Sequence, residues 1–176
     1  AQCLLRSKEL GEHTWFPKNR YRWPVAMARM WEAQGDLDGA LHLLQEAERL
    51  VVSSFSPNVR PVAAWKARAW VAQGRLDEAL GWAREQGLSA EDEPSYLHEF
   101  EHITLARILL ARAKSDRSGR SIQEATAWLD RLLTAAQRGR RMGSVIEILV
   151  LQALAHQAQG GLAPALVALE RALTLA

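Results

Sequence analysis

One segment of this chain recurs, and a recurring unit constrains the fold more than any other feature of a sequence. The segment "WEAQGDLDGALHLL" (Trp31–Leu44) returns as "WVAQGRLDEALGWA" (Trp70–Ala83) and, less closely, as "HQAQGGLAPALVAL" (His156–Leu169). A weaker copy is "SIQEATAWLDRLL" (Ser121–Leu133). Equivalent alanines, spaced 39, 46 and 40 residues apart, mark the register of the copies: Ala40, Ala79, Ala125 and Ala165. Spacing of this order is typical of stacked helical repeats.

Each copy has the features of a helix hairpin. A glycine (Gly35, Gly74 or Gly160) follows three of the helical patterns, where a residue after the helix end often adopts the left-handed conformation. The small register alanine allows the two helices of a unit to approach closely. Runs of Val, Ile and Thr long enough for strands are nearly absent. We therefore predict an all-α fold, a right-handed superhelical array of about four helix hairpins.

The prediction treats the chain as a single repeat domain, residues 1–176, with one partial and four complete units. Their boundaries are about 1–22 (partial), 23–55, 57–90, 94–138 and 142–176. First helices are expected near 24–34, 58–73, 95–113 and 143–159, and second helices near 37–52, 76–86, 121–138 and 162–175. Residues 1–11 are expected to form the second helix of a preceding unit. Because the array starts within a unit and ends on "LERALTLA" without a polar capping helix, we expect a fragment of a larger protein.

Composition narrows the class of protein. No apolar run approaches the roughly 18 residues of a membrane span, and no signal-peptide pattern is present at the start. The single cysteine, Cys3, cannot form an internal disulfide, which fits a cytoplasmic protein. The formal net charge is +2 and the arginines are spread along the chain. We therefore expect no direct contact with nucleic acid and no contact with a membrane.

The stretch "HEFEH", from His98 to His102, matches the zinc-protease pattern H-E-x-x-H. A catalytic zinc needs three protein ligands, and the extended pattern would require glycine and histidine where Leu105 and Ile108 stand. Helical spacing instead puts both histidines on one stripe with Leu105 and Leu109, so they are expected to be half-buried packing or groove residues. We predict no enzymatic activity, no metal and no cofactor.

A series of charged residues occupies equivalent places in the repeats. Each lies 18 or 19 residues before its register alanine, once about six inserted residues are removed from the third unit. The series is Arg22, Arg60, Glu101 and Glu147. First helices of a solenoid tend to line its concave face, so the series could form a polar groove for an effector. Alternatively, it forms a ladder of ion pairs between repeats, since a buried charge without a partner is costly.

Aromatic side chains accompany this series. Trp23 and Trp65 are expected near the same surface, and with His98 and His102 they complete the predicted effector or partner groove. Aromatic rings beside polar groups are what a sugar site would need. The alternative is that these tryptophans only pack the repeats together.

Longer strings carry a family resemblance. They include "NRYRWPVAMARMWEAQGDLDGAL", "GLSAEDEPSYLHEFEHITLARILLAR" and "GSVIEILVLQALAHQAQGGLAPALVALERAL". Together they resemble the tetratricopeptide-like (TPR-like) helical repeat domain of MalT-like, LuxR-type ATP-dependent bacterial transcriptional regulators, from about Leu4 to Leu175. In such regulators a repeat domain lies between a signalling ATPase and a helix-turn-helix. This chain has no G-x-x-x-x-G-K-[ST] and no recognisable DNA-reading helix pair, so the resemblance implies the middle sensor domain.

The resemblance implies a domain that senses a small-molecule inducer or a regulatory protein, and the aromatic residues named above would suit a sugar as that inducer. The alternative hypothesis is a protein–protein scaffold or self-association module without a small-molecule ligand. We favour a zinc metallopeptidase least.

Overall fold

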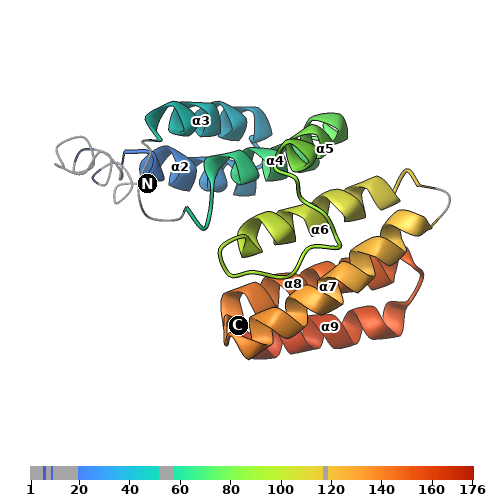
Figure 1. Cartoon of the computed structure of the whole chain (residues 1–176). Helices are drawn as coiled ribbons and strands as arrows, with labels where there is room; N and C mark the ends of the chain where they lie inside the picture. Colours follow the sequence, from blue (N-terminus) through green and yellow to red (C-terminus); the bar gives the residue numbers. More distant parts are fainter. Residues whose placement is uncertain (1–5, 7–8, 10–19, 52–57, 117–118) are drawn as a thin grey trace. The chain divides into compact units, whose positions relative to one another are not determined.

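The computed structural model describes Arg6, Glu9 and residues 20–51, 58–116 and 119–176 (Figure 1). Every regular element within these ranges is an α-helix. This confirms the predicted fold class, an all-α TPR-like helical repeat array. The predicted helix over residues 1–11 falls almost entirely outside the described residues. The described chain divides into two compact units, unit 1 (Ala1–Arg75) and unit 2 (Leu76–Ala176).

Unit 1 contains α2 (Arg22–Ala33), α3 (Leu37–Leu50) and α4 (Val62–Ala72). Helix α3 packs against α2 and α4 (Figure 1). The register alanine Ala40 is buried between them. Gly39 precedes it in α3, and a Cβ at that position would lie only 2.3 Å from Cε3 of Trp31. The missing side chain therefore allows the indole of α2 to lie directly on α3.

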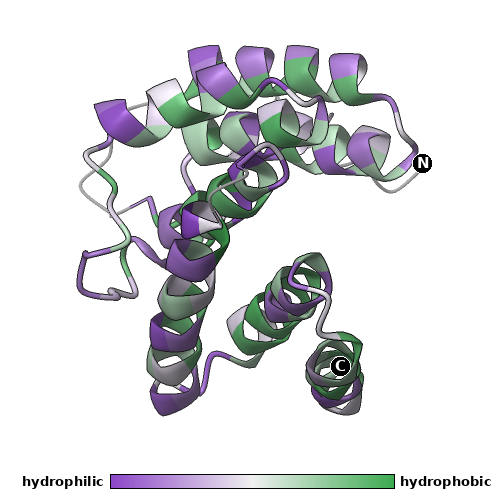
Figure 2. Cartoon of the chain, turned by 90° about the vertical axis from the view of Figure 1, so that its right-hand side faces the viewer, coloured by the Kyte–Doolittle hydropathy of each residue, from purple (hydrophilic) through white to green (hydrophobic). Residues whose placement is uncertain are grey.

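Unit 2 contains five helices, in which second and first helices of successive repeats alternate. They are α5 (Leu76–Glu85), α6 (Glu99–Ala113), α7 (Arg120–Arg138), α8 (Met142–Ala158) and α9 (Leu162–Leu175). Each helix packs on the next along the chain, and α8 also contacts α6. The core is filled by fully buried side chains such as Trp128, Leu129 and Ile148. Hydrophobic residues continue along α8 and α9 to the end of the chain (Figure 2).

The turns between the first and second helices of three hairpins have the predicted geometry. Gly35, Gly74 and Gly160 all have positive φ, at 87°, 75° and 78°. The amide of the next residue bonds back to the last helical turn, as Asp36 N–H does to Trp31 O at 2.9 Å. The turn after α7 uses the same geometry without glycine, since Arg140 has φ 52°. Left-handed backbone at a residue with a Cβ costs about 1 kcal/mol.

Two first helices begin four residues later than predicted. Helix α4 starts at Val62 rather than 58, because Pro61 precedes it in an extended conformation and disfavours helix in the residue before it. Helix α6 starts at Glu99 rather than 95. There the amide of Leu97 bonds to the Ser95 hydroxyl at 3.3 Å, a local turn that competes with the helix. The other helix limits lie within about two residues of the prediction, as is usual for helix ends.

Candidate effector- and partner-binding site

Buried polar side chains gather at the start of α6. The buried polar or charged residues of the described chain are Arg68, Glu99, Glu101, His102, Thr104, Ser121 and Gln152. All except Arg68 belong to unit 2, and four of them lie in the first two turns of α6. Because burying charge is costly without partners, these residues need hydrogen bonds from neighbouring elements. We call Glu99, Glu101 and His102, with the side chains that bond or ion-pair to them, the polar centre.

Glu99 ties the start of α6 to the start of α8. Its carboxylate accepts a hydrogen bond from Arg141 Nε at 2.6 Å and another from the Ser144 hydroxyl at 2.6 Å. The guanidinium of Arg141 also lies 5.9 Å from the centre of the Tyr96 ring. Two donors, one of them a guanidinium, occupy about half of the acceptor sites of this carboxylate. Its burial therefore fixes the turn before α8 against α6.

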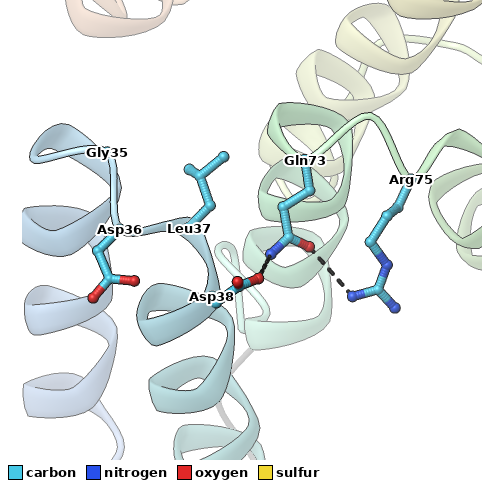
Figure 3. A pocket seen from close by; sticks show the side chains of 6 residues that line it. All are labelled: Gly35, Asp36, Leu37, Asp38, Gln73 and Arg75. Carbon is cyan, nitrogen blue, oxygen red and sulfur yellow. Dashed lines mark hydrogen bonds between the residues drawn. The ribbon is translucent and has the colours of Figure 1, made fainter.

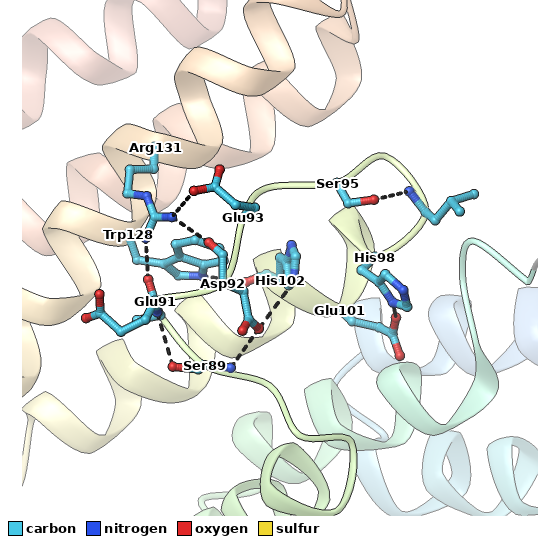
Figure 4. A network of polar contacts seen from close by, with 12 residues as sticks. Ser89, Glu91, Asp92, Glu93, Ser95, His98, Glu101, His102, Trp128 and Arg131 are labelled. Carbon is cyan, nitrogen blue, oxygen red and sulfur yellow. Dashed lines mark hydrogen bonds and ion pairs between the residues drawn. The ribbon is translucent and has the colours of Figure 1, made fainter.

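Glu101 is partnered locally by His98. The distance between His98 Nδ1 and Glu101 Oε2 is 2.7 Å (Figure 4). The side chain of His98 is 60% exposed and that of Glu101 is 12% exposed. The prediction that His98 is half-buried in a stripe with His102, Leu105 and Leu109 is wrong about its burial, although the ring centroids of the two histidines are 6.1 Å apart. It precedes the helix with non-helical φ of −110°, so it projects toward solvent, whereas the other three are buried.

His102 lies inside unit 2. Its ring meets the Trp128 ring edge-on, with centroids 5.1 Å apart, and the Trp128 indole N–H donates to the carbonyl of His102 at 3.2 Å. Its Nε2 is 3.7 Å from Asp92 Oδ2, and its buried Nδ1 has no hydrogen-bond partner in the described part of the chain. Burial lowers the pKa of His102, against the opposing attraction of Asp92. The ring is therefore favoured in its neutral form.

The loop from Gln86 to His98 is held by one side chain of α7. Arg131 donates through Nη1 to the carbonyl of Ala90 at 2.6 Å and through Nη2 to the carbonyl of Asp92 at 2.5 Å (Figure 4). The same guanidinium lies 5.1 Å from the centre of the Trp128 ring. Asp92 in turn accepts from the Ser89 amide at 2.9 Å. The loop thus supplies Asp92 to the polar centre from a fixed position.

The predicted charge series is divided between the two units. Arg22 is the exposed first residue of α2, and Arg60 is exposed and precedes α4, both in unit 1. In unit 2, Glu147 of α8 accepts from Nε and Nη2 of Arg107 in α6, at 3.2 and 2.9 Å. That pair joins the first helices of two consecutive repeats, but Arg107 is not a member of the series, and Glu101 pairs with His98 of its own repeat. A groove shared by all four residues stays a prediction.

The two tryptophans of the predicted groove take part in repeat packing. Trp23 and Trp65 are half-buried and pack against the core of unit 1. The guanidinium groups of Arg29 and Arg68 lie 5.1 and 5.4 Å from the centre of the Trp65 ring. Cation–π contacts of this kind stabilise partly desolvated arginines. The indoles of Trp23 and Trp65 therefore contribute to the structure of unit 1. A role of these two residues in ligand binding stays a prediction.

Contacts between repeats use two register positions that the sequence analysis missed. Thirteen residues before the register alanine, Lys66 bonds to Glu48 of α3 at 2.7 Å, and Gln152 bonds to Asp130 of α7 at 2.6 Å. Six residues before the register alanine, the side-chain amide of the glutamine in "AQG" also donates to the preceding second helix. Gln73 donates to Asp38 at 2.8 Å and Gln159 donates to Thr126 at 3.2 Å. The recurrence of that glutamine in the repeats was the available signal.

A shallow hollow in unit 1 lies beside these contacts (Figure 3). Its lining residues are Gly35, Asp36, Leu37, Asp38, Gln73 and Arg75. The polar side chains are hydrogen-bonded to one another. Asp38 accepts from the Gln73 side-chain amide, and Oε1 of Gln73 accepts from Arg75 at 3.3 Å. Asp36 caps α3 by accepting from the Gly39 amide at 2.9 Å. The hollow therefore follows from the repeat turn itself.

Neither a cluster of metal ligands nor a membrane span is found among the described residues. They contain no group of three or more His, Cys, Asp or Glu side chains placed to hold a metal ion. None of the helices in these ranges is both long and apolar enough to cross a membrane.

Comparisons with known proteins give one match. A family model described as the MalT-like TPR region matches residues 1–176. No curated protein and no solved structure gives a significant match.

Proposed function

This chain belongs to the family of MalT-like TPR regions, and we propose that it is the effector- or partner-sensing domain of a bacterial, LuxR-type transcription regulator. In this proposal the domain acts in the cytoplasm and has no catalysis of its own. The observation that supports it is the polar centre. A repeat core needs only apolar contacts, yet unit 2 buries Glu99, Glu101 and His102 at the start of a single helix.

The chemistry around the polar centre suits a neutral, hydroxyl-rich ligand such as a sugar. Tyr96 is 59% exposed and lies beside Arg141, so its ring is available for stacking. His98 and Glu101 form a pair that is open to solvent on the histidine side. A sugar stacked on Tyr96 could exchange hydrogen bonds with Glu101 and Arg141, which offer an acceptor and a donor.

The packing suggests how such binding would be transmitted. Arg141 and Ser144 hold Glu99 from the start of α8, and Arg131 holds the preceding loop from α7. A ligand that takes over a partner of Glu99 or Glu101 therefore changes how α6 packs on α7 and α8. A ligand can shift the domain between two states only if it binds one state better. The attached parts of the regulator would respond to that shift.

Thermal unfolding with a panel of neutral mono- and oligosaccharides tests this proposal. We expect at least one sugar to raise the unfolding midpoint of the wild-type chain and of the control variant Glu91→Gln, whose side chain is exposed in the same loop. The same sugar should have no effect on Glu101→Gln or Tyr96→Ala. If no sugar shifts the midpoint, or if all four proteins respond equally, sugar sensing at this site is wrong.

A second candidate function is a protein–protein scaffold or self-association module without a small-molecule ligand. One observation favours it: large apolar side chains of α9, including Leu166 and Leu173, are exposed. Sedimentation equilibrium of the chain, with and without added sugar, separates the two candidates. A sugar-independent complex would support the scaffold.

A further inference from the structure

An apolar face on the last helix pair is open. On α9 the exposed leucines recur at steps of four, three and four residues, a spacing that keeps them on one side of a helix and is typical of a seam between helices. The second half of α8 adds two exposed apolar residues to it. We define the open face by its residues, Val150, Leu154, Leu162, Leu166, Leu169 and Leu173. Large apolar side chains that are exposed together along one side of a helix are typical of an interaction site.

The repeat register shows that the open face of α9 corresponds to a surface of α7 that is covered. Leu129 and Leu133 lie four and eight residues after Ala125, and they are 0% and 9% exposed because α8 packs on α7. Leu169 and Leu173 lie at the same places after Ala165, and they are 39% and 77% exposed. The same positions are therefore covered on α7 and uncovered on α9.

Helix α8 shows the same contrast with α6. Once the longer connection after α6 is allowed for, Leu154 corresponds to Ile108 and Val150 corresponds to Thr104. Ile108 is fully buried, in a helix that α8 covers, whereas Leu154 is 50% exposed. Both helices of the last hairpin thus expose apolar residues at the positions where α8 covers the preceding hairpin.

A polar contact should accompany the apolar one. At two of the described junctions between repeats, α3–α4 and α7–α8, the residue 13 positions before the register alanine donates to an acidic residue of the preceding helix, as in Lys66 to Glu48 and Gln152 to Asp130. Glu170 is the acidic residue of α9, and it lies five residues after Ala165 just as Asp130 lies five after Ala125. Glu170 is thus placed to accept a hydrogen bond from a donor on the occupant.

From this register we propose that the open face binds the first helix of a further repeat hairpin of this class. The occupant is an apolar helix that packs across α8 and α9 as α8 packs across α6 and α7. It carries a lysine or glutamine that donates to Glu170. The proposal rests on the packing of unit 2 and is independent of whether the polar centre binds a sugar.

An extended chain tests it. A second copy of residues 137–176 is joined directly after Ala176, which lies 11 residues after Ala165 just as Ala136 lies 11 after Ala125. The junction therefore continues the register and brings a second copy of Gln152 toward Glu170. We expect the unfolding midpoint to rise by about 5 °C with a single transition. We also expect less binding of a hydrophobic dye than by the original chain.

The control is the double substitution Leu169→Lys and Leu173→Lys, made in both chains. Because both side chains are exposed in residues 1–176, the midpoint of the original chain should change by less than about 2 °C. In the extended chain the same pair should abolish the whole gain and expose the added hairpin to protease. A smaller loss of the gain is expected for Glu170→Ala.

Two results would overturn the proposal. In the first, the extended chain keeps the original midpoint, and protease removes its added hairpin equally fast with and without the lysine pair. In the second, sedimentation shows that the original chain dimerises at tens of micromolar and that the lysine pair dissociates the dimer. The occupant would then be a second copy of this chain.

Discussion

The junction between α3 and α4 in unit 1 and the junction between α7 and α8 in unit 2 use the same register for different chemistry. Each first helix sends one donor from 13 residues and one from six residues before its register alanine. In unit 1 the first donor is a lysine paired with a glutamate that is 47% exposed. In unit 2 it is a buried amide, Gln152. Repeat geometry therefore fixes where polar contacts occur, whereas the type and burial of the residue at each position determine how strong the contact is.

Unit 2 differs further in what surrounds that junction. Glu99–Arg141 and Glu147–Arg107 join α6 to the start and middle of α8, and Arg131 secures the loop before α6. The described part of unit 1 buries a single charged residue, Arg68. Surface pairs contribute little to stability, whereas partly buried ones are costly to break. The difference predicts that polar substitutions destabilise unit 2 more than unit 1.

The largest effect is expected for Glu99→Ala. It removes the carboxylate that accepts from both Arg141 and Ser144, and it leaves Arg141, whose side chain is 23% exposed, without its counter-charge. We expect a loss of about 2–3 kcal/mol in the free energy of unfolding, measured by urea denaturation. Ser144→Ala, which removes one neutral donor, should cost about 1 kcal/mol. Equal losses for the two variants would contradict the role assigned to the charged pair.

A glycine pair tests packing in the two units. Gly39→Ala should cost about 1–2 kcal/mol, because the new methyl group collides with the Trp31 ring. Gly81→Ala in α5 has open space around its Cβ and should stabilise its helix by about 0.5 kcal/mol or more. Urea denaturation followed by tryptophan fluorescence measures both. A neutral Gly39→Ala would show that the α2–α3 hairpin can repack.

The donors 13 residues before the register alanine allow the most direct comparison. Gln152→Ala removes a buried amide and its partly buried 2.6 Å hydrogen bond to Asp130, and should cost about 1 kcal/mol. Lys66→Ala removes a pair with an exposed glutamate and should cost about 0.5 kcal/mol. High salt should reduce only the second loss. The opposite order would mean that burial does not set the strength of these contacts.

The smallest effect concerns pH. In the unfolded chain His102 takes up a proton near its ordinary pKa of 6.5, whereas burial lowers its pKa in the folded chain. The unfolded state therefore binds more protons below pH 6.5, so stability is complete above that pH and decreases as pH falls toward the folded pKa. Urea midpoints measured from about pH 7.5 to 5.5 should show this slope, and His102→Gln should lack it. An unchanged slope in the variant would assign it to other groups.

Sequence periodicity predicted the helices and the left-handed glycine turns because both depend on local backbone preferences. It failed at His98, where a turn around Ser95 delayed the helix and turned an expected packing residue outward. It also failed to place the loop before α6, because Arg131 reaches it across 41 residues of sequence to the carbonyl of Ala90. Such contacts depend on tertiary packing, which no spacing along the chain encodes.

Arg140 gives the turn after α7 a feature that the glycine turns lack. The glycine turns at Gly35, Gly74 and Gly160 lie within hairpins and present bare backbone, whereas Arg140 lies between two hairpins and carries a guanidinium. Of the residues that the structure describes, Arg140 is the one with a Cβ in this conformation. The connection from α7 to α8 therefore carries a positive charge at a backbone position that the turns inside the hairpins leave bare.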